Sequence, residues 1–198
     1  DLAISANGML VYTTNGGAEK ELVWVTRDGT ATPIDAAWHD AITSVALSPD
    51  GTELAVGVDA PTDRKVWIRR LDRGRASMLR SEGVFDERPA WTPDGQSVMF
   101  LSNGASRAKP GHDLYVSRAD GRSMPRLLLR DEGEVNDAEY SRDGQWLVYQ
   151  TRFDLFAIRA GHDSTRMKLV ATKFLETSPR LSPDGRWLVW DQRETDLA

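Results

Sequence analysis

A four-residue turn recurs along the chain and constrains its fold more than any other feature. Its copies are Ser48-Pro49-Asp50-Gly51, Thr92-Pro93-Asp94-Gly95, Ser141-Arg142-Asp143-Gly144 and Ser182-Pro183-Asp184-Gly185, with a degenerate copy at Ser5-Ala6-Asn7-Gly8. Proline restricts φ at the second position, Asp or Asn can hydrogen-bond the nearby backbone, and Gly accepts a positive φ. We therefore interpret eight positions as structural turn residues: Asp50, Gly51, Asp94, Gly95, Asp143, Gly144, Asp184 and Gly185.

Apolar residues alternate on both sides of these turns. Val45 and Leu47 precede the turn at Asp50, and Leu54 and Val56 follow it. A period of two places such residues on one face of a β-strand, which is then buried. Two strands that flank a tight turn form a β-hairpin. Each copy of the turn therefore predicts a hairpin with one buried face.

The turns return at a regular interval. Asn7, Asp50, Asp94, Asp143 and Asp184 are separated by 43, 44, 49 and 41 residues. Each complete interval holds four strand-like runs, which is typical of a β-propeller blade. We predict an all-β fold, a single β-propeller domain over residues 1–198 with about four complete four-stranded antiparallel blades plus an inner hairpin. The predicted blades cover residues 1–35, 42–80, 87–130 and 136–171, and the partial blade covers residues 177–198.

The turn and the strand after it resemble the WD40-like (PD40) repeat of TolB-like propellers. The resemblance is carried by Trp91-Thr92-Pro93-Asp94-Gly95 and by Leu181-Ser182-Pro183-Asp184-Gly185-Arg186-Trp187. Similar repeats occur in prolyl-oligopeptidase-like peptidases. The order of repeats is also similar to the propeller region of some bacterial serine/threonine protein kinases. The resemblance implies that the chain is part of a six-bladed propeller, and it implies an extracytoplasmic (periplasmic) bacterial location.

Composition and missing motifs limit the chemistry. The net charge of −5 argues against nucleic-acid binding, and the absence of Cys excludes disulfides and thiolate metal sites. No apolar run approaches the roughly 20 residues that span a bilayer, so we expect no membrane insertion by this segment. We find no Gly-x-Ser-x-Gly elbow, no phosphate or dinucleotide loop and no calcium loop. These observations predict a non-catalytic chain without a cofactor or metal.

Candidate binding residues precede the inner strands, where the entry loops of a propeller converge on its central channel. They are Asp40, Asp86, Glu87, Arg88, Asn136, Asp137 and Glu176. This ring is mostly acidic, which predicts a channel-mouth site for a cation, a basic peptide or a polar ligand. The alternative is a solvated rim without a ligand. His39, His112 and His162 are interpreted as solvated loop residues.

The leading functional interpretation is a non-catalytic module for protein–protein interaction or ligand sensing, with a protein or peptide partner. The alternative is an accessory propeller of a larger enzyme, either a receptor-like serine/threonine kinase or a prolyl-oligopeptidase-like peptidase. A third reading is a purely structural repeat. Because Trp187 and Trp190 lie on an incomplete blade, we also expect association through the terminal blades, most simply with a second copy of the chain.

Overall fold

The computed structural model describes residues 2–4, 10–13, 19–72, 76–104, 111–161 and 165–193, which contain β-strands and no helix. The first sheet contains β1 (Leu2–Ile4), β2 (Leu10–Thr13), β3 (Leu22–Val25) and β4 (Ala31–Pro33). The second contains β5 (Ile42–Leu47), β6 (Glu53–Asp59), β7 (Arg64–Arg70) and β8 (Ser77–Met78). The third contains β9 (Asp86–Trp91), β10 (Ser97–Ser102), β11 (Asp113–Arg118) and β12 (Arg126–Leu129). The fourth contains β13 (Asp137–Tyr140), β14 (Trp146–Gln150), β15 (Leu155–Arg159) and β16 (Met167–Val170), and a hairpin of β17 (Leu175–Leu181) and β18 (Leu188–Arg193) follows.

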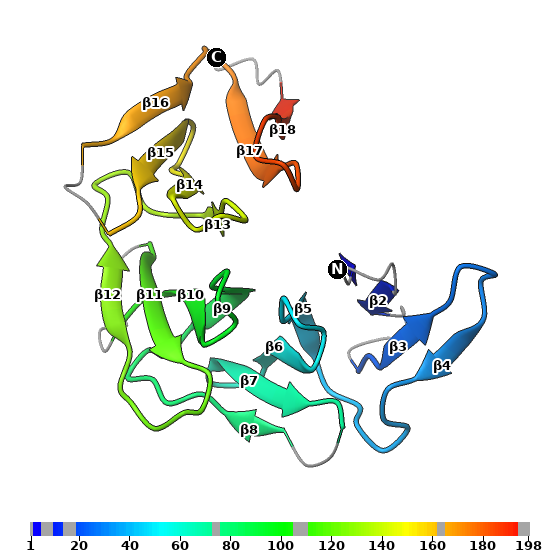
Figure 1. Ribbon diagram of the computed structural model, residues 1–198. Coiled ribbons are helices and arrows are strands. Elements are labelled where there is room, and N and C mark those ends of the chain that lie inside the picture. The colour runs from blue at the N-terminus through cyan, green and yellow to red at the C-terminus, as the bar shows by residue number, and fades with distance from the viewer. Residues whose placement is uncertain are drawn as a thin grey trace.

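Each sheet is one propeller blade. Strands that are neighbours in a sheet are consecutive in the chain and antiparallel. Figure 1 shows the blades arranged as an arc, with β5, β9, β13 and β17 on its inner side and β4, β8, β12 and β16 on its outer side. The first blade and the β17–β18 hairpin lie at the two ends of this arc. The predicted all-β propeller, with four complete blades and an inner hairpin, is confirmed.

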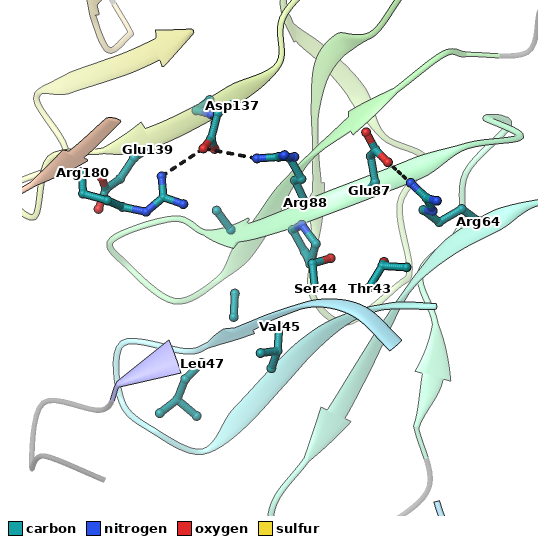
Figure 2. A pocket seen from close by; sticks show the side chains of 14 residues that line it. Thr43, Ser44, Val45, Leu47, Arg64, Glu87, Arg88, Asp137, Glu139 and Arg180 are labelled. Atoms are coloured by element: carbon teal, nitrogen blue, oxygen red, sulfur yellow. Dashed lines mark hydrogen bonds and ion pairs between the residues drawn. The ribbon is translucent and has the colours of Figure 1, made fainter. Parts of the chain in front are cut away.

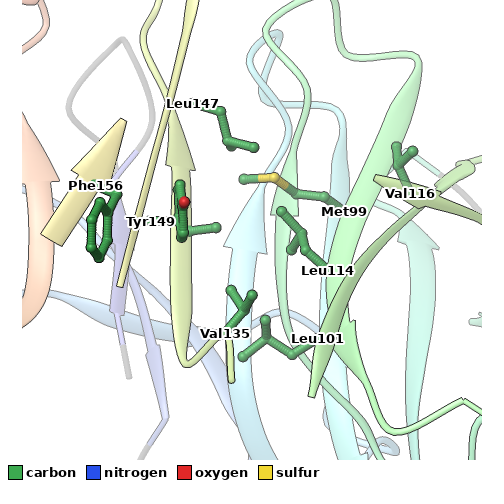
Figure 3. Close-up of a cluster of buried hydrophobic side chains, with 9 residues drawn as sticks. Met99, Leu101, Leu114, Val116, Val135, Leu147, Tyr149 and Phe156 are labelled. Carbon is green, nitrogen blue, oxygen red and sulfur yellow. The ribbon is translucent and has the colours of Figure 1, made fainter. Parts of the chain in front are cut away.

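Buried side chains between the blades form the core. In β10, Val98 and Phe100 pack against the second blade, whereas Met99 and Leu101 pack against the fourth. Figure 3 shows the cluster between the third and fourth blades, where Met99 lies between Leu114 and the side chains of β14. Successive residues of a strand point to opposite faces of its sheet, so each middle strand contributes to two interfaces. The prediction that each hairpin buries only one face is therefore wrong for the middle strands, which are buried on both faces.

The four Asp-Gly turns share one hydrogen-bond pattern. The Ser48 hydroxyl donates to Asp50 Oδ1 at 2.6 Å and accepts the backbone N–H of Glu53 at 2.9 Å, while Asp50 Oδ1 accepts the N–H of Thr52 at 3.0 Å. The Ser48 hydrogen bond is the main reason why the pKa of Asp50 lies below its usual range. As the turn pattern predicts, φ is positive at all four glycines, 74°, 68°, 70° and 67° at Gly51, Gly95, Gly144 and Gly185.

Three inner strands are irregular in their first halves, before they reach their turns. The pairing register of β5, β9 and β17 with the following strand shifts near Thr43, Arg88 and Ser178. Arg88 and Ser178 have positive φ values of 50° and 56°, and each precedes a proline. A bulge of this kind bends the strand and redirects its side chains. It therefore sets how the inner strands present their side chains on the inner side of the arc.

Candidate functional site

A pocket of about 500 Å³ lies on the inner side of the arc (Figure 2). Its walls come from β5, β9 and β13, with Arg64 of β7 and Arg180 of β17. The lining residues are Thr43, Ser44, Val45, Ala46, Leu47, Arg64, Glu87, Arg88, Pro89, Ala90, Asp137, Ala138, Glu139 and Arg180. Four of the five sheets thus contribute side chains to one concave site.

Asp137 joins three inner strands at this pocket. Its Oδ2 atom accepts a hydrogen bond from Arg180 Nη1 at 3.0 Å and lies 3.4 Å from Arg88 Nη1. Figure 2 shows the two guanidinium groups on opposite sides of the carboxylate. The Asp137 side chain is only 8% exposed, whereas those of Arg88 and Arg180 are 53% and 58% exposed. The cluster therefore presents guanidinium groups to the pocket and keeps its carboxylate inside.

Glu139 lies in the same wall, two residues after Asp137. Its Oε2 atom accepts the backbone N–H of Leu181 at 2.9 Å, which links the fourth blade to β17. Burial raises the pKa of Glu139, and the Leu181 N–H and the charge of Arg180 act in the opposite direction. This carboxylate therefore already serves as an acceptor between blades.

Arg64 and Glu87 form a second charged pair at the pocket. Arg64 donates to Glu87 and to Asp59, and the bond from its Nη2 to Asp59 Oδ2 measures 3.0 Å. His112 lies beside this pair, with Nε2 3.9 Å from Glu87 Oε1 and Nδ1 3.6 Å from Glu134 Oε1. His112 lies in a loop, as the sequence suggested, but its side chain is only 23% exposed and two carboxylates flank its imidazole.

Two hydroxyl groups line the pocket on β5. Thr43 Oγ1 and Ser44 Oγ are buried and have no hydrogen-bond partner in the part of the chain that the structure describes. Gly57 of the adjacent β6 leaves the space for them, since a Cβ at that position would approach Ser44 Oγ to 2.4 Å. Any side chain at residue 57 would therefore displace these hydroxyls.

The structure brings together only some of the residues that the sequence singled out. Glu87, Arg88 and Asp137 line the pocket. Asp86 is 1% exposed and accepts from the Ser102 hydroxyl at 2.6 Å, with Lys65 Nζ 3.3 Å away. Asp86 therefore lies inside its blade and outside the pocket lining.

Three further candidates also lie away from the pocket lining. Glu176 is 0% exposed and bonds to the hydroxyl of Thr172. Asp40 Oδ2 accepts from Trp38 Nε1 at 3.0 Å, and its backbone pairs with Lys20. Asn136 donates its backbone N–H to Gln150 at 2.9 Å. His39 is exposed, and His162 lies outside the described residues.

The charge of the pocket differs from the expected acidic ring. Three arginines, Arg64, Arg88 and Arg180, lie beside the carboxylates Glu87, Asp137 and Glu139. Alignment of the repeats on their turn aspartates does not single out Arg64 or Arg180. Arg64 belongs to the third strand of its blade, and Arg180 lies two positions later in its repeat than Arg88 does in its own. Arg180 and Glu139 each lie four residues before the aspartate of a turn, and this shared position is the sequence feature that could have identified them.

Ranges 19–72, 76–104, 111–161 and 165–193 contain no cluster of three or more His, Asp or Glu side chains that could hold a metal ion. No helix that could cross a bilayer occurs in the part of the chain that was placed.

Comparison with known proteins gives a consistent family. The model for the TolB beta propeller domain (PD40) matches residues 35–197. The "Uncharacterized peptidase YuxL" of Bacillus subtilis is 28% identical over 158 residues, which cover 75% of this chain and 21% of that protein. The "Protein TolB homolog" of Chlorobium luteolum is 27% identical over 162 residues, 79% of this chain and 35% of the homolog. The chain thus spans well under half the length of these two relatives.

A solved structure supports the same assignment at the level of fold. The putative TolB from Agrobacterium tumefaciens matches with a TM-score of 0.82 at 18% identity, over 99% of this chain and 70% of that one. Identity at this level shows the fold alone. The family model, however, matches most of the sequence, and the chain therefore belongs to the TolB β-propeller family.

Proposed function

We propose that this chain is a non-catalytic propeller module that binds a protein or peptide in the pocket of its inner strands. The observation that carries the proposal is the meeting of Arg88, Asp137 and Arg180 from three different sheets at one pocket. A concave site with a few convergent polar groups is the usual form of a binding site. A pocket of about 500 Å³ suits a few side chains of an extended segment.

The non-catalytic part of the proposal is supported by the chemistry of the pocket. A nucleophilic hydroxyl needs a base within hydrogen-bond reach. Thr43 and Ser44 supply the hydroxyls of the pocket wall, and neither has a hydrogen-bond partner among the described residues. The absence of nucleophile-elbow and phosphate-loop motifs from the sequence agrees with this assignment.

Selection from a random peptide display library on the purified chain tests the binding function. We expect the selected peptides to lose about tenfold in affinity, measured by calorimetry, when Arg180 is changed to Gln, because a charge-assisted hydrogen bond contributes about 1.5–3 kcal/mol. Arg70→Gln is the matched control, since Arg70 is 57% exposed and pairs with Asp72 away from the pocket. Failure to select any peptide, or binding that both variants leave unchanged, would refute the proposal.

A second candidate function is an accessory propeller within a larger enzyme. It is favoured by the peptidase named among the relatives, of which this chain covers 21%. The reading frame around the chain tests this candidate directly. A peptidase or kinase domain on the same polypeptide would support this second function. A polypeptide with neither domain would refute it, and the binding module would then be the remaining candidate.

A further inference from the structure

The charged side chains of the pocket differ in what they offer to a ligand. Both oxygens of Asp137 are occupied, since Oδ2 contacts Arg88 and Arg180 and Oδ1 accepts the backbone N–H of Ala138 at 2.9 Å. Glu139 accepts the N–H of Leu181. Both carboxylates of this wall therefore have partners inside the protein, and the charge of Asp137 is shared between two arginines.

The two guanidinium groups are in the opposite situation. A guanidinium carries five N–H donors. Arg88 contacts Asp137 through Nη1, and Arg180 uses Nη1 for both Asp137 and the Pro179 carbonyl. The contacts among the described residues thus leave Nη2 and Nε of both arginines for other partners. With more than half of each side chain exposed, these donors are accessible from the pocket.

The arginines are also held in place. Arg88 has a φ of 50° and directly precedes Pro89. In β17, Ser178 has a φ of 56° and precedes Pro179, and Arg180 comes next. Because proline restricts its own φ and the conformation of the residue before it, the backbone is constrained at Arg88 and directly before Arg180. The shared carboxylate of Asp137 then fixes the guanidinium ends. Such preorganisation reduces the entropy lost when a ligand binds.

We propose that the pocket recognises a carboxylate, presented by an Asp or Glu side chain or by the C-terminus of a peptide, through the guanidinium groups of Arg88 and Arg180. The planar fork of arginine matches a carboxylate in a bidentate pair. This inference rests on the proposed binding function and names the chemistry of its ligand. It reverses the expectation of a cation or basic peptide that the acidic residues of the sequence suggested.

Charge favours a carboxylate over a phosphate. The two arginines face the two carboxylates Asp137 and Glu139, so this wall carries no net charge when all four groups are ionised, and each further negative charge on a ligand adds repulsion. A phosphate group carries about −1.5 to −2 charges at neutral pH, and it would add repulsion from Asp137 and Glu139 in the same wall.

Nuclear magnetic resonance of the arginine Nε–H groups in the full chain tests the proposal. Arg88→Gln and Arg180→Gln assign the two signals. N-acetylglutamic acid α-amide supplies a side-chain carboxylate, N-acetylglycine supplies a terminal carboxylate, and N-acetylglutamine amide, N-acetyllysine amide and inorganic phosphate complete the set. We expect at least one carboxylate to shift both signals saturably, and the neutral and cationic compounds to leave them unchanged. The carboxylate compound that binds more tightly shows whether the pocket prefers a side-chain carboxylate or a peptide C-terminus.

Variants and salt provide the controls. Either Arg→Gln change should weaken carboxylate binding about tenfold, added chloride should weaken it further, and Arg70→Gln should have no effect. An unchanged backbone spectrum shows that each variant is folded. Absence of a shift with both carboxylates, equal binding of the glutamine or lysine compound, or tighter binding of phosphate would overturn the inference. If library peptides bind in the pocket without an acidic group, the proposed function stands and this inference alone falls.

Discussion

The hydroxyl at the first position of each Asp-Gly turn connects the two strands that the turn joins. Ser48, Thr92, Ser141 and Ser182 each donate to the turn aspartate and accept an N–H from the start of the next strand. The hydroxyl thus satisfies a backbone donor where the β-ladder begins. The role of Ser and Thr in the repeat is therefore a matter of hydrogen bonding.

Gly95 is the residue at which the turn conformation can be tested most directly. Its φ is 68°, and a Cβ added there would meet only Pro49 Cδ, at 3.6 Å. Space is therefore available, and the cost of a side chain comes from the left-handed backbone. We expect Gly95→Val to lower the free energy of unfolding by about 1–2 kcal/mol in urea titrations. Gly95→Asn, which tolerates this conformation better, should lose less, and equal losses would contradict the explanation.

The turn aspartates should make stability depend on acid. Hydrogen bonds lower the pKa of Asp50, Asp94, Asp143 and Asp184, and the hydroxyl at the first turn position is the largest cause in each case. A lowered pKa in the folded state contributes stability that is complete above the unfolded value, about 3.9, and is lost as pH falls through the folded value. We therefore expect the free energy of unfolding to decrease steeply below about pH 4.

The matching variant is Asp94→Asn, which should flatten this decrease in urea midpoints measured between about pH 2 and pH 7. Glu139 acts in the opposite direction, because burial raises its pKa and the folded state then holds its proton more tightly. The stability that Glu139 contributes is present at low pH and is lost as pH rises from its unfolded pKa through its folded pKa. This range lies above that of the turn aspartates, so the two effects can be measured separately. If Asp94→Asn leaves the decrease in the free energy of unfolding at low pH unaltered, the turn aspartates are not its cause.

At the level of the element, the proline of one turn lies beside the glycine of the next turn. A Cβ on Gly144 would lie 3.6 Å from Pro93 Cγ, as one on Gly95 would from Pro49, but nothing lies within 4 Å at Gly185. The preceding turn carries Arg142 in place of proline, and a cavity of about 360 Å³ separates Trp146 from the last turn. The missing proline therefore accounts for a gap between the fourth blade and the hairpin.

Arg142→Pro should close part of this gap. The other three full turns have proline at the same position, so the backbone conformation is compatible. We expect a gain of about 0.4–1 kcal/mol in the free energy of unfolding, mainly because proline restricts the unfolded chain. Arg142→Ala separates this effect from the loss of the arginine side chain and should give no comparable gain. Destabilisation by proline alone would show that this turn differs from the other three.

The strands and turns could be predicted because their signals are local. Alternation around each Asp-Gly pair depends on residues within one hairpin. The strand-like runs that precede three of the turns cover residues 43–47, 88–92 and 137–141, and β5, β9 and β13 begin and end within two residues of them. The pocket depends on contacts between blades. Arg180 reaches Asp137 across 43 positions of the chain, and no periodicity within a blade encodes that distance.

The burial of two acidic candidate residues could not be predicted from the sequence, for a related reason. Asp86 and Glu176 occupy the same position relative to their turns, which suggested a shared place at the channel mouth. In the structure, Ser102 and Thr172 supply hydrogen bonds to these carboxylates inside their own blades, while Glu176 Oε2 has no hydrogen-bond partner among the described residues. Such partners lie in other strands and loops, so the sequence pattern shows the carboxylates without showing what satisfies them.

For the whole molecule, the unusual surface is the outward face of the β17–β18 hairpin. The fifth residue after each turn aspartate faces the next blade, and it is buried at Ala55, Met99 and Val148, with exposed fractions of 0%, 1% and 3%. The equivalent Val189 is 67% exposed, as is Trp187 beside it. The hairpin therefore presents the type of face that the complete blades bury against a neighbour.

We expect this face to drive association of the chain in solution, most simply with a second copy. Burying one large apolar side chain is worth about 1.5–3 kcal/mol. Among the described residues β18 pairs only with β17, so its other edge offers backbone groups for pairing. Light scattering and sedimentation at tens of micromolar should detect a species larger than 22.1 kDa. Val189→Lys should shift the chain towards the monomer, because it places a charge on the contact face. Leu127→Lys, at a 42% exposed position on the outer strand β12, should leave the association unchanged. A chain that stays monomeric at these concentrations, or two variants with the same behaviour, would show that this face does not mediate the contact.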